Sequence, residues 1–164
     1  MINWSTADTP FGPFTAVVDD DGAVLASGWT TRPDELTALI NNRLLTEQPR
    51  ETADLGPVSR AVRDYHDGDP RAVDSVPVRQ SSGEFLETAW LALREVPAGQ
   101  PVSYATLAEL AGRPKAVRAA AGACARNAAA LFVPCHRVLR SDGSLGGFRY
   151  GTHVKQQLLD HERS

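Results

Sequence analysis

The sequence predicts an α+β fold of two domains, a small N-terminal α/β domain over residues 1–77 and a mainly helical C-terminal domain over residues 78–164. Two observations predict this fold. A hairpin pattern and two helical patterns occupy the first half, whereas four helical patterns, two of them joined by a tight turn, occupy the second. A chain of 164 residues is long enough for two small domains.

The first predicted elements are two strands that form a hairpin. Residues 15–18 and 23–26 are apolar runs that flank an acidic turn, and the Asp21-Gly22 pair in this turn is a strong hairpin signal. A helix is predicted next, over residues 33–43. The proline at its start suits a first turn, acidic residues follow it, and apolar residues at helical spacing form one face.

A shorter helix is predicted over residues 58–65, and a polar connection follows it. Residues 66–82 carry few large apolar side chains and begin with the breaker sequence His-Asp-Gly-Asp-Pro. We expect this stretch to join the two domains.

The second half is predicted to be helical. Residues 83–95 carry apolar side chains on one helical face. Ser103 is a good N-cap for a helix that ends near residue 111, and a turn at 112–114 leads to a second helix over 115–125. Helix, tight turn and helix is the helix-turn-helix pattern, which also occurs in proteins that never bind DNA. A last helix is predicted over residues 155–162.

The composition is that of a soluble globular protein, with 42% hydrophobic and 23% charged residues. No apolar run is long enough to span a membrane, and we expect no secretory signal. Two cysteines do not make a disulfide framework, so a cytoplasmic location is expected. The net charge of −3 divides into −7 over residues 1–77 and +4 over residues 78–164, which weakly favours an anionic partner for the second half.

The most informative stretch is Pro134-Cys135-His136-Arg137-Val138. Cysteine reacts as a thiolate, and a neighbouring base or positive charge promotes that form. The alternative is a buried structural cysteine beside a surface histidine, and the pair alone does not decide between the two. A glycine-rich loop over residues 145–151 follows, as an active-site lid would.

The predicted helix over residues 115–125 has unusually small side chains. A slim helix with cationic arms would approach a DNA groove closely, while the arms meet phosphates or enter the base stack. Tight packing on a neighbouring helix explains the same residues, and this alternative stays open. The small residues are Ala116, Ala119, Ala120, Ala121, Gly122 and Ala123, and the long exceptions are Lys115, Arg118 and Arg126.

In order and spacing, these motifs resemble the 6-O-alkylguanine-DNA alkyltransferases, also called methylated-DNA–protein-cysteine methyltransferases. The resemblance runs without gaps from about residue 103 to residue 162, and its Pro-Cys-His-Arg-Val core is highly specific. Residues 9–14 also look like the opening strand of the family. The other matching pieces are Ser103-Tyr104, Gly112-Arg113-Pro114-Lys115-Ala116, Arg118, Asn127, residues 141–147, Lys155, Leu158-Leu159 and Glu162.

The resemblance implies a winged-helix-like C-terminal domain and a direct DNA repair reaction without a cofactor. Cys135 would accept the alkyl group, mainly methyl, of a flipped 6-O-alkylguanine irreversibly, so each molecule acts once. His136 would act as base on the Cys135 thiol through a bound water, and Glu162 would orient His136. Tyr104 would donate a hydrogen bond to the leaving guanine oxygen. Arg137 is expected to tie down the active-site turn rather than to contact DNA.

The resemblance also implies how DNA would be held. Arg118 matches the arginine that fills the space left by the flipped base, which offsets part of the cost of flipping. Asn127 matches the hinge asparagine and is also a good C-cap residue. The expected partner is alkylated double-stranded DNA, bound by a monomer through the helix-turn-helix in the minor groove, with no membrane contact. Further candidate contacts are Ser103, Lys115, Ala119, Ala120, Gly122, Arg126, Val133, Phe148, Arg149 and Tyr150.

Two departures from the family pattern surround the site. Alanines at positions 128 and 130 replace prolines that usually follow the hinge asparagine, so this loop is expected to be less rigid. The family lid usually reads Gly-Tyr-x-Gly-Gly, whereas Phe148 lacks the hydroxyl and Tyr150 replaces a glycine. If Tyr150 points into the pocket, bulky alkyl groups fit poorly. If it points out, Arg149 and Tyr150 contact DNA.

A structural zinc in the N-terminal domain is not expected. Residues 1–77 contain no cysteine and a single histidine, and the chain has no nucleotide-binding glycine motif. Cys124, where the family often has methionine, is expected to be a core thiol rather than a second acceptor.

Three other functions stay open at the level of sequence. An alkyltransferase-like protein that flags lesions without transfer is disfavoured by Cys135, because such relatives lack the acceptor cysteine. A cysteine hydrolase would usually have its histidine far from the cysteine in sequence. A DNA-binding sensor of alkylation would have to work without an added regulatory domain.

Overall fold

The computed structural model describes residues 1–163 and has a mixed α+β fold, as predicted. The chain forms two compact units, the first comprising Met1–Ser81 and Ala128–Phe132 and the second comprising Ser82–Asn127 and the chain from Val133 onward. The first part of the N-terminal unit therefore ends at Ser81 rather than at residue 77. Residues 128–132, from later in the chain, also belong to this unit. Within the described residues, no helix has the length and apolar character needed to cross a membrane.

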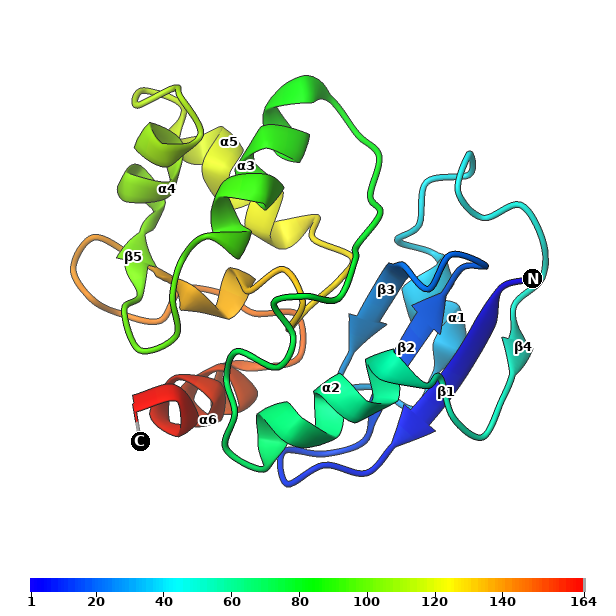
Figure 1. Ribbon diagram of the computed structural model, residues 1–164. Helices are drawn as coiled ribbons and strands as arrows, with labels where there is room; N and C mark the ends of the chain where they lie inside the picture. The colour runs from blue at the N-terminus through cyan, green and yellow to red at the C-terminus, as the bar shows by residue number, and fades with distance from the viewer. Residues whose placement is uncertain (164) are drawn as a thin grey trace. The chain divides into compact units, whose positions relative to one another are not determined.

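A four-stranded sheet of β1 (Asn3–Ala7), β2 (Phe14–Val18), β3 (Val24–Gly28) and β4 (Arg50–Glu51) is the basis of the N-terminal unit. The strand order is β3-β2-β1-β4 (Figure 1). Neighbouring strands are antiparallel except β1 and β4, which are parallel.

The predicted hairpin is confirmed as β2 and β3. In its turn, one carboxylate oxygen of Asp19 accepts hydrogen bonds from the N–H groups of Asp21 and Ala23, at 2.9 and 3.0 Å. Gly22 has a φ of +79°, which favours glycine at that position. The acidic run before the glycine therefore helps to stabilise the turn.

The opening strand expected over residues 9–14 is wrong for most of that range. The first strand is β1, and Thr9 and Gly12 form a turn in which each backbone N–H donates to the other's carbonyl. Gly12 has a φ of +117°, and the two prolines in this stretch have no N–H to give to a ladder. Only Phe14 belongs to a strand, as the first residue of β2.

Two helices, α1 (Pro33–Thr37) and α2 (Pro57–His66), cover opposite faces of this sheet (Figure 1). Leu36 of α1 packs into a cluster with strand residues that include Val17, whereas the Phe14 ring lies 6.5 Å from the His66 ring of α2. The α2 prediction is confirmed. The predicted helix over residues 33–43 is too long, because the chain turns after α1 and the Asn41 side chain then bonds to the backbone.

Two segments that were expected to be connections pair with the free edge of β3 instead. Val24 donates its N–H to the carbonyl of Pro77 at 2.8 Å, so part of the expected linker extends the sheet. Further along β3, the Ser27 N–H donates to the Ala128 carbonyl at 2.9 Å, and the Ala130 N–H donates to the Ser27 carbonyl at 3.2 Å. These bonds explain why residues 128–132 belong to the N-terminal unit.

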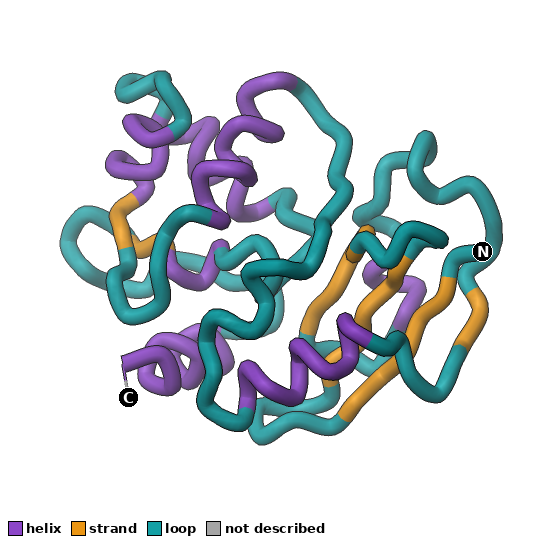
Figure 2. The backbone as a smooth tube through the Cα atoms, in the orientation of Figure 1, coloured by secondary structure: helices purple, strands orange, loops and turns teal. Residues whose placement is uncertain are grey.

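The second unit is mainly helical, as predicted. Ser103 caps α4 as expected, since its hydroxyl accepts the N–H of Thr106 at 3.0 Å. From residue 140 to residue 151 the chain has neither helix nor strand (Figure 2). The elements are α3 (Glu84–Arg94), β5 (Val102–Ser103), α4 (Tyr104–Leu110), α5 (Val117–Ala125), the 3₁₀ turn η1 (Cys135–Arg137), β6 (Val138–Leu139) and α6 (Thr152–Arg163), with β5 and β6 paired in parallel.

The small residues of α5 serve close packing along part of the helix. Ala120 and Ala123 are fully buried, and the indole N–H of Trp90 on α3 donates to the carbonyl of Ala123 at 2.9 Å. Ala119 is exposed. Close packing therefore accounts for Ala120 and Ala123, whereas approach of α5 to a DNA groove stays a prediction.

Candidate active site

Cys135 and His136 lie on the single turn of η1, directly after Pro134. On extended backbone, neighbouring side chains point to opposite faces, and the turn removes that obstacle to their cooperation. The Arg137 N–H donates to the Pro134 carbonyl at 3.0 Å and closes the turn, and the Cys135 N–H donates to the Val133 carbonyl at 2.8 Å just before it. The turn is deeply placed, because Cys135 is 8% exposed and His136 is 0% exposed.

His136 and Arg137 both bind Glu162 of α6. Nε2 of His136 lies 2.8 Å from Oε2 of Glu162. The Arg137 guanidinium donates to both carboxylate oxygens, at 2.9 and 3.0 Å, and to the Val96 carbonyl at 2.7 Å. The expectation that Arg137 ties down the turn rather than facing DNA is confirmed by these contacts and by its burial.

This network sets the protonation states of Glu162 and His136. Burial by itself would raise the pKa of Glu162, but hydrogen bonds from His136 and Arg137 and their charges outweigh it and lower the pKa to about 2. Burial lowers the pKa of His136, so the imidazole is neutral. Because its Nε2–H faces the carboxylate, its Nδ1 carries the lone pair. Among the described residues, Nδ1 has no hydrogen-bond partner.

The Cys135 thiol is protonated in the resting protein. Burial raises its pKa above the ordinary value, whereas a hydrogen bond from the Asn127 side chain and the charges of Lys155 and Arg149 act in the opposite direction. A base is therefore needed to form the thiolate, and the buried lone pair on Nδ1 of His136 is the predicted one, on the same turn.

Lys155 clamps the start of the glycine-rich loop. Its fully buried ammonium group donates to the carbonyls of Val138, at 2.8 Å, Gly147, at 3.3 Å, and Leu145. The sequence analysis gave Lys155 no role. Its helical spacing with the inward-facing Leu158 was a signal that this lysine is buried.

Tyr104 lies against the same loop. A methyl group at Gly146 would come within 2.8 Å of the Tyr104 hydroxyl oxygen, and Gly146 has a φ of +72°. Burial raises the pKa of Tyr104, and the nearby thiols of Cys124 and Cys135 raise it further. The hydroxyl therefore stays protonated and available as a donor.

Asn127 and Arg149 connect the end of α5 to this loop. The Asn127 side-chain amide donates to the Val133 carbonyl at 2.8 Å. The guanidinium of Arg149 donates to the Asn127 carbonyl at 2.9 Å and also to the Ala125 carbonyl. Sequence reasoning placed Arg149 among the DNA contacts and did not predict these bonds.

Comparison with known proteins agrees with this geometry. A family model described as "6-O-methylguanine DNA methyltransferase, DNA binding domain" matches residues 84–164. The methylated-DNA–protein-cysteine methyltransferase of Salmonella typhimurium is 33% identical over 156 residues, which cover 94% of this chain and 91% of that protein. The chain belongs to this family.

Two further relatives extend the comparison. The bifunctional transcriptional activator/DNA repair enzyme Ada of Escherichia coli is 54% identical over 78 residues, which are 48% of this chain and only 22% of that protein. The crystal structure of Mycobacterium tuberculosis OGT in complex with DNA superposes with a TM-score of 0.79 and 25% identity, covering 98% of this chain and 92% of that one.

The DNA contacts that the family resemblance suggested differ in exposure. The side chains of Ala120 and Val133 are buried, so a contact of either residue with DNA or the flipped base stays a prediction. Val133 contributes its carbonyl to Asn127 and Cys135. Among the remaining candidate residues, the exposed ones are Lys115, Arg118, Ala119, Arg126 and Arg149. The half-buried ones are Ser103, Gly122, Phe148 and Tyr150.

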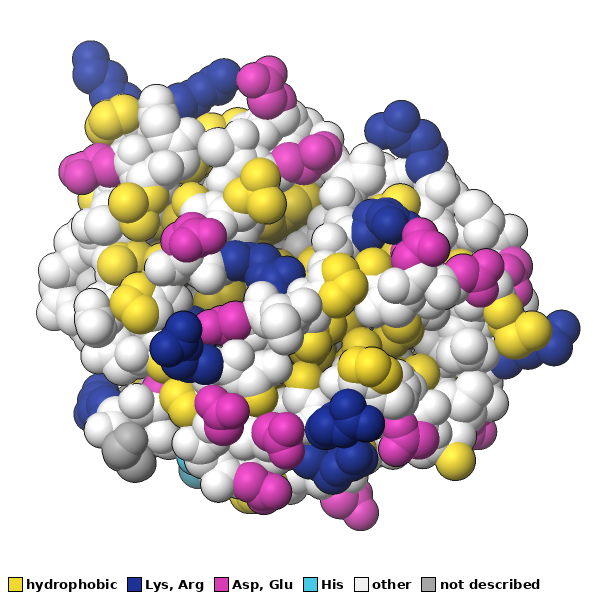
Figure 3. Space-filling view, in the orientation of Figure 1, with side chains coloured by type: hydrophobic (Ala, Val, Ile, Leu, Met, Phe, Trp, Pro, Cys, Tyr) yellow, Lys and Arg dark blue, Asp and Glu magenta, His cyan; other side chains and the backbone are white. Residues whose placement is uncertain are grey.

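The lid of this family member carries two aromatic rings in contact. Phe148 and Tyr150 pack edge to face, with ring centroids 5.7 Å apart. On the face of the molecule drawn in Figure 3, basic side chains are interspersed with acidic ones, so this face is not a uniform cationic surface.

Cys124 is half-buried on α5. Burial raises the pKa of its thiol well above the ordinary value, and the nearby Cys135 thiol raises it further. That Cys124 is not a second acceptor stays a prediction. The described residues contain no group of three or more His, Cys, Asp or Glu side chains placed to hold a metal ion.

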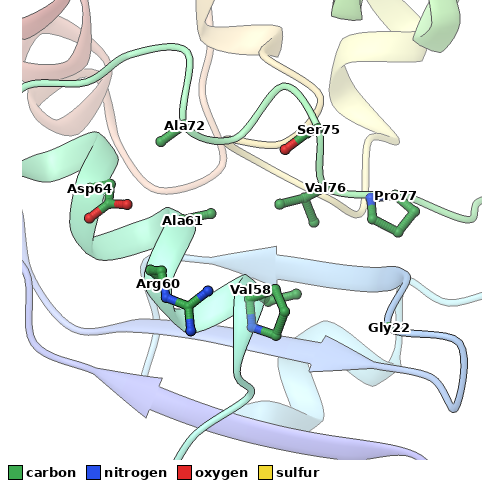
Figure 4. Close-up of a pocket in the computed structure, with 10 residues that line it drawn as sticks. Gly22, Val58, Arg60, Ala61, Asp64, Ala72, Ser75, Val76 and Pro77 are labelled. Atoms are coloured by element: carbon green, nitrogen blue, oxygen red, sulfur yellow. The ribbon is translucent and has the colours of Figure 1, made fainter.

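A separate hollow of about 230 Å³ lies in the N-terminal unit (Figure 4). Arg60 and Asp64 line it from α2, and Ser75 lines it from the following segment. None of the residues predicted for the reaction lines this hollow, so it is distinct from the site around η1.

Proposed function

We propose that this protein repairs DNA by transferring the alkyl group of 6-O-alkylguanine, mainly methyl, to Cys135. The observation that carries the proposal is the arrangement of a buried thiol and a neutral imidazole on one 3₁₀ turn, with Glu162 holding the imidazole at 2.8 Å. Such a base next to such a thiol is what nucleophilic attack on an alkyl carbon requires.

The transfer proceeds as a single displacement. The Cys135 proton moves to Nδ1 of His136, through one bridging water, and the thiolate attacks the alkyl carbon. The new sulfur–carbon bond forms as the carbon–oxygen bond breaks, and the electron pair passes to the guanine oxygen. The Tyr104 hydroxyl donates a hydrogen bond to that oxygen. His136 then gives up its proton to the nucleobase, which remains in the DNA as guanine. The resulting thioether is stable, so each molecule acts once.

The buried carboxylate supports the proton transfer. An ionised Glu162 stabilises the imidazolium that forms when His136 takes the proton, and it fixes the tautomer beforehand. Arg137 holds the carboxylate from the other side through two hydrogen bonds. The base is thus oriented before the lesion arrives.

DNA is the partner that this reaction requires. The proposal places α5 at the minor groove of double-stranded DNA, with Arg118 entering the space of the flipped base and Lys115 and Arg126 near phosphates. The exposure of these three side chains and the small Ala119 beside them support this placement. We further propose that the protein acts as a monomer in the cytoplasm, where thiols stay reduced.

Intact mass tests the proposal directly. The protein is mixed with a duplex that carries one 6-O-methylguanine, and the modified peptide is mapped. One added methyl group on Cys135 is expected, and none in the Cys135→Ser variant, which should still bind the duplex. DNA binding by the wild type without any mass change would instead indicate a lesion-binding module and refute the transfer reaction.

A further inference from the structure

The guanidinium of Arg149 occupies an unusual place for a residue of an exposed loop. It donates to the carbonyl of Ala125, the last residue of α5, and to the carbonyl of Asn127 two residues beyond it. The last carbonyls of a helix lack partners within the helix and carry partial negative charge. A planar cation with several N–H donors suits two such carbonyls at once.

This contact joins the lid to the residues that surround the thiol. Arg149 binds the backbone of Asn127, the Asn127 side chain binds the Val133 carbonyl, and that carbonyl also accepts the Cys135 N–H. Three successive hydrogen-bonded contacts therefore lead from the lid to the backbone of the acceptor.

The lid has a second attachment at its other end. The buried ammonium group of Lys155 holds the carbonyls of Leu145 and Gly147. Between Gly147 and the start of α6, Arg149 attaches the lid to the end of α5 through side-chain hydrogen bonds. Without Arg149 the lid loses this attachment, while Lys155 and the packed rings of Phe148 and Tyr150 still restrain it.

We propose that Arg149 is a positioning residue for alkyl transfer, which holds the lid and Asn127 in the arrangement that the Cys135 reaction needs. The inference rests on the proposed function. It also differs from a direct role in DNA binding, because the guanidinium is already engaged by two carbonyls in the absence of DNA.

The positive charge of Arg149 favours the Cys135 reaction, as its hydrogen bonds to the backbone do. Its positive charge lowers the pKa of Cys135 and so opposes part of the effect of burial. A lysine at position 149 would keep this charge but lose the forked contact with two carbonyls. Arg149→Lys therefore separates the charge from the geometry.

The test compares wild type, Arg149→Ala and Arg149→Lys on two substrates under single-turnover conditions. One is a duplex with one 6-O-methylguanine, and the other is the free nucleoside 6-O-methyl-2′-deoxyguanosine, which offers no DNA backbone. The rate constant at saturating substrate should fall by about tenfold in Arg149→Ala, the scale of one lost charge-assisted hydrogen bond, on both substrates. Arg149→Lys should recover part of the loss.

Two further measurements keep the proposal independent of activity. Amide hydrogen exchange over residues 145–151 should be faster in Arg149→Ala than in wild type. The dissociation constant for unmodified duplex should change no more than in Arg71→Ala, which removes an equally charged, exposed side chain from the other unit.

The outcomes separate the two proposals. A loss confined to the duplex, with weaker binding and a shallower salt dependence, would show that Arg149 contacts DNA and would overturn the positioning role. Unchanged lid exchange would overturn it as well. Absence of transfer by the wild type on both substrates would refute the proposed function, while hydrogen exchange would still decide whether Arg149 holds the lid.

Discussion

Replacing Glu162 by glutamine tests the network that organises the active-site turn. The substitution keeps the shape of the side chain and removes its charge. Arg137, which is 3% exposed, then loses its only ionic partner in the described structure, and His136 loses the carboxylate that fixes its tautomer. Removing one partner of a buried pair costs about 3–5 kcal/mol of stability.

A second route gives a similar magnitude. The pKa of Glu162 falls from 4.5 to about 2 in the folded protein. At pH 7 this depression corresponds to about 3 kcal/mol of stability, since each pKa unit is worth about 1.4 kcal/mol. We therefore expect Glu162→Gln to lower the free energy of unfolding by about 3 kcal/mol at neutral pH.

The assay is urea denaturation at pH 7, followed by far-ultraviolet circular dichroism. Glu109→Gln is the matched control, because Glu109 is exposed on α4 and its substitution should change stability by less than about 0.5 kcal/mol. In an Arg137→Met background, Glu162→Gln should cost less, since no buried cation is left unpaired. Equal stability of Glu162→Gln and wild type, or an undiminished cost in the Arg137→Met background, would refute the reasoning.

Three other changes have defined outcomes. Gly146→Ala should lower the melting temperature and the transfer rate, because its methyl group would meet the Tyr104 hydroxyl at a position with φ of +72°, whereas Gly147→Ala has open space and should behave like wild type. Ala128→Pro should cost about 1–3 kcal/mol in urea denaturation, since it removes an N–H that donates at 3.0 Å to a side-chain oxygen; unchanged stability would contradict this. In wild type, the free energy of unfolding should fall as pH drops below about 6.5, because buried His136 has a lowered pKa and the unfolded chain takes up the proton first. His136→Gln should flatten that part of the pH profile, and an unchanged slope between pH 6.5 and 5 would count against it.

Local chemistry decided which features the sequence predicted. The turn at Gly22, the cap at Ser103 and the adjacency of Cys135 and His136 each depend on residues close together in the chain. The interactions that produce these features involve only residues close together in the chain, and the structure contains these features as expected. The family resemblance added Glu162 beside His136, a contact between residues 26 positions apart that no spacing rule supplies.

Partners distant in sequence decided what was missed. The helix predicted over residues 33–43 ends at Thr37, and beyond it the Asn41 side-chain amide donates to the Ser81 carbonyl at 3.2 Å, 40 positions along the chain. The N–H groups of the loop with alanines at 128 and 130, which prolines would lack, bond to Ser27 and Gln80, contacts that the sequence analysis did not predict. These partners lie tens of residues away in the sequence, so the periodicity of apolar residues does not predict them.

The resting state of the acceptor follows from the same balance of forces. A thiol that is spent after one transfer benefits from staying protonated until a lesion is present, because the thiolate is the form that reacts with other alkylating agents and oxidants. Burial keeps Cys135 in the thiol form, and Asn127, Lys155 and Arg149 limit how far burial raises its pKa. In the proposed reaction, the neutral His136 beside it takes the proton when the alkyl carbon is in place. Two of the opposing residues, Lys155 and Arg149, also hold the lid, so the geometry of the lid and the readiness of the thiol are set by the same side chains.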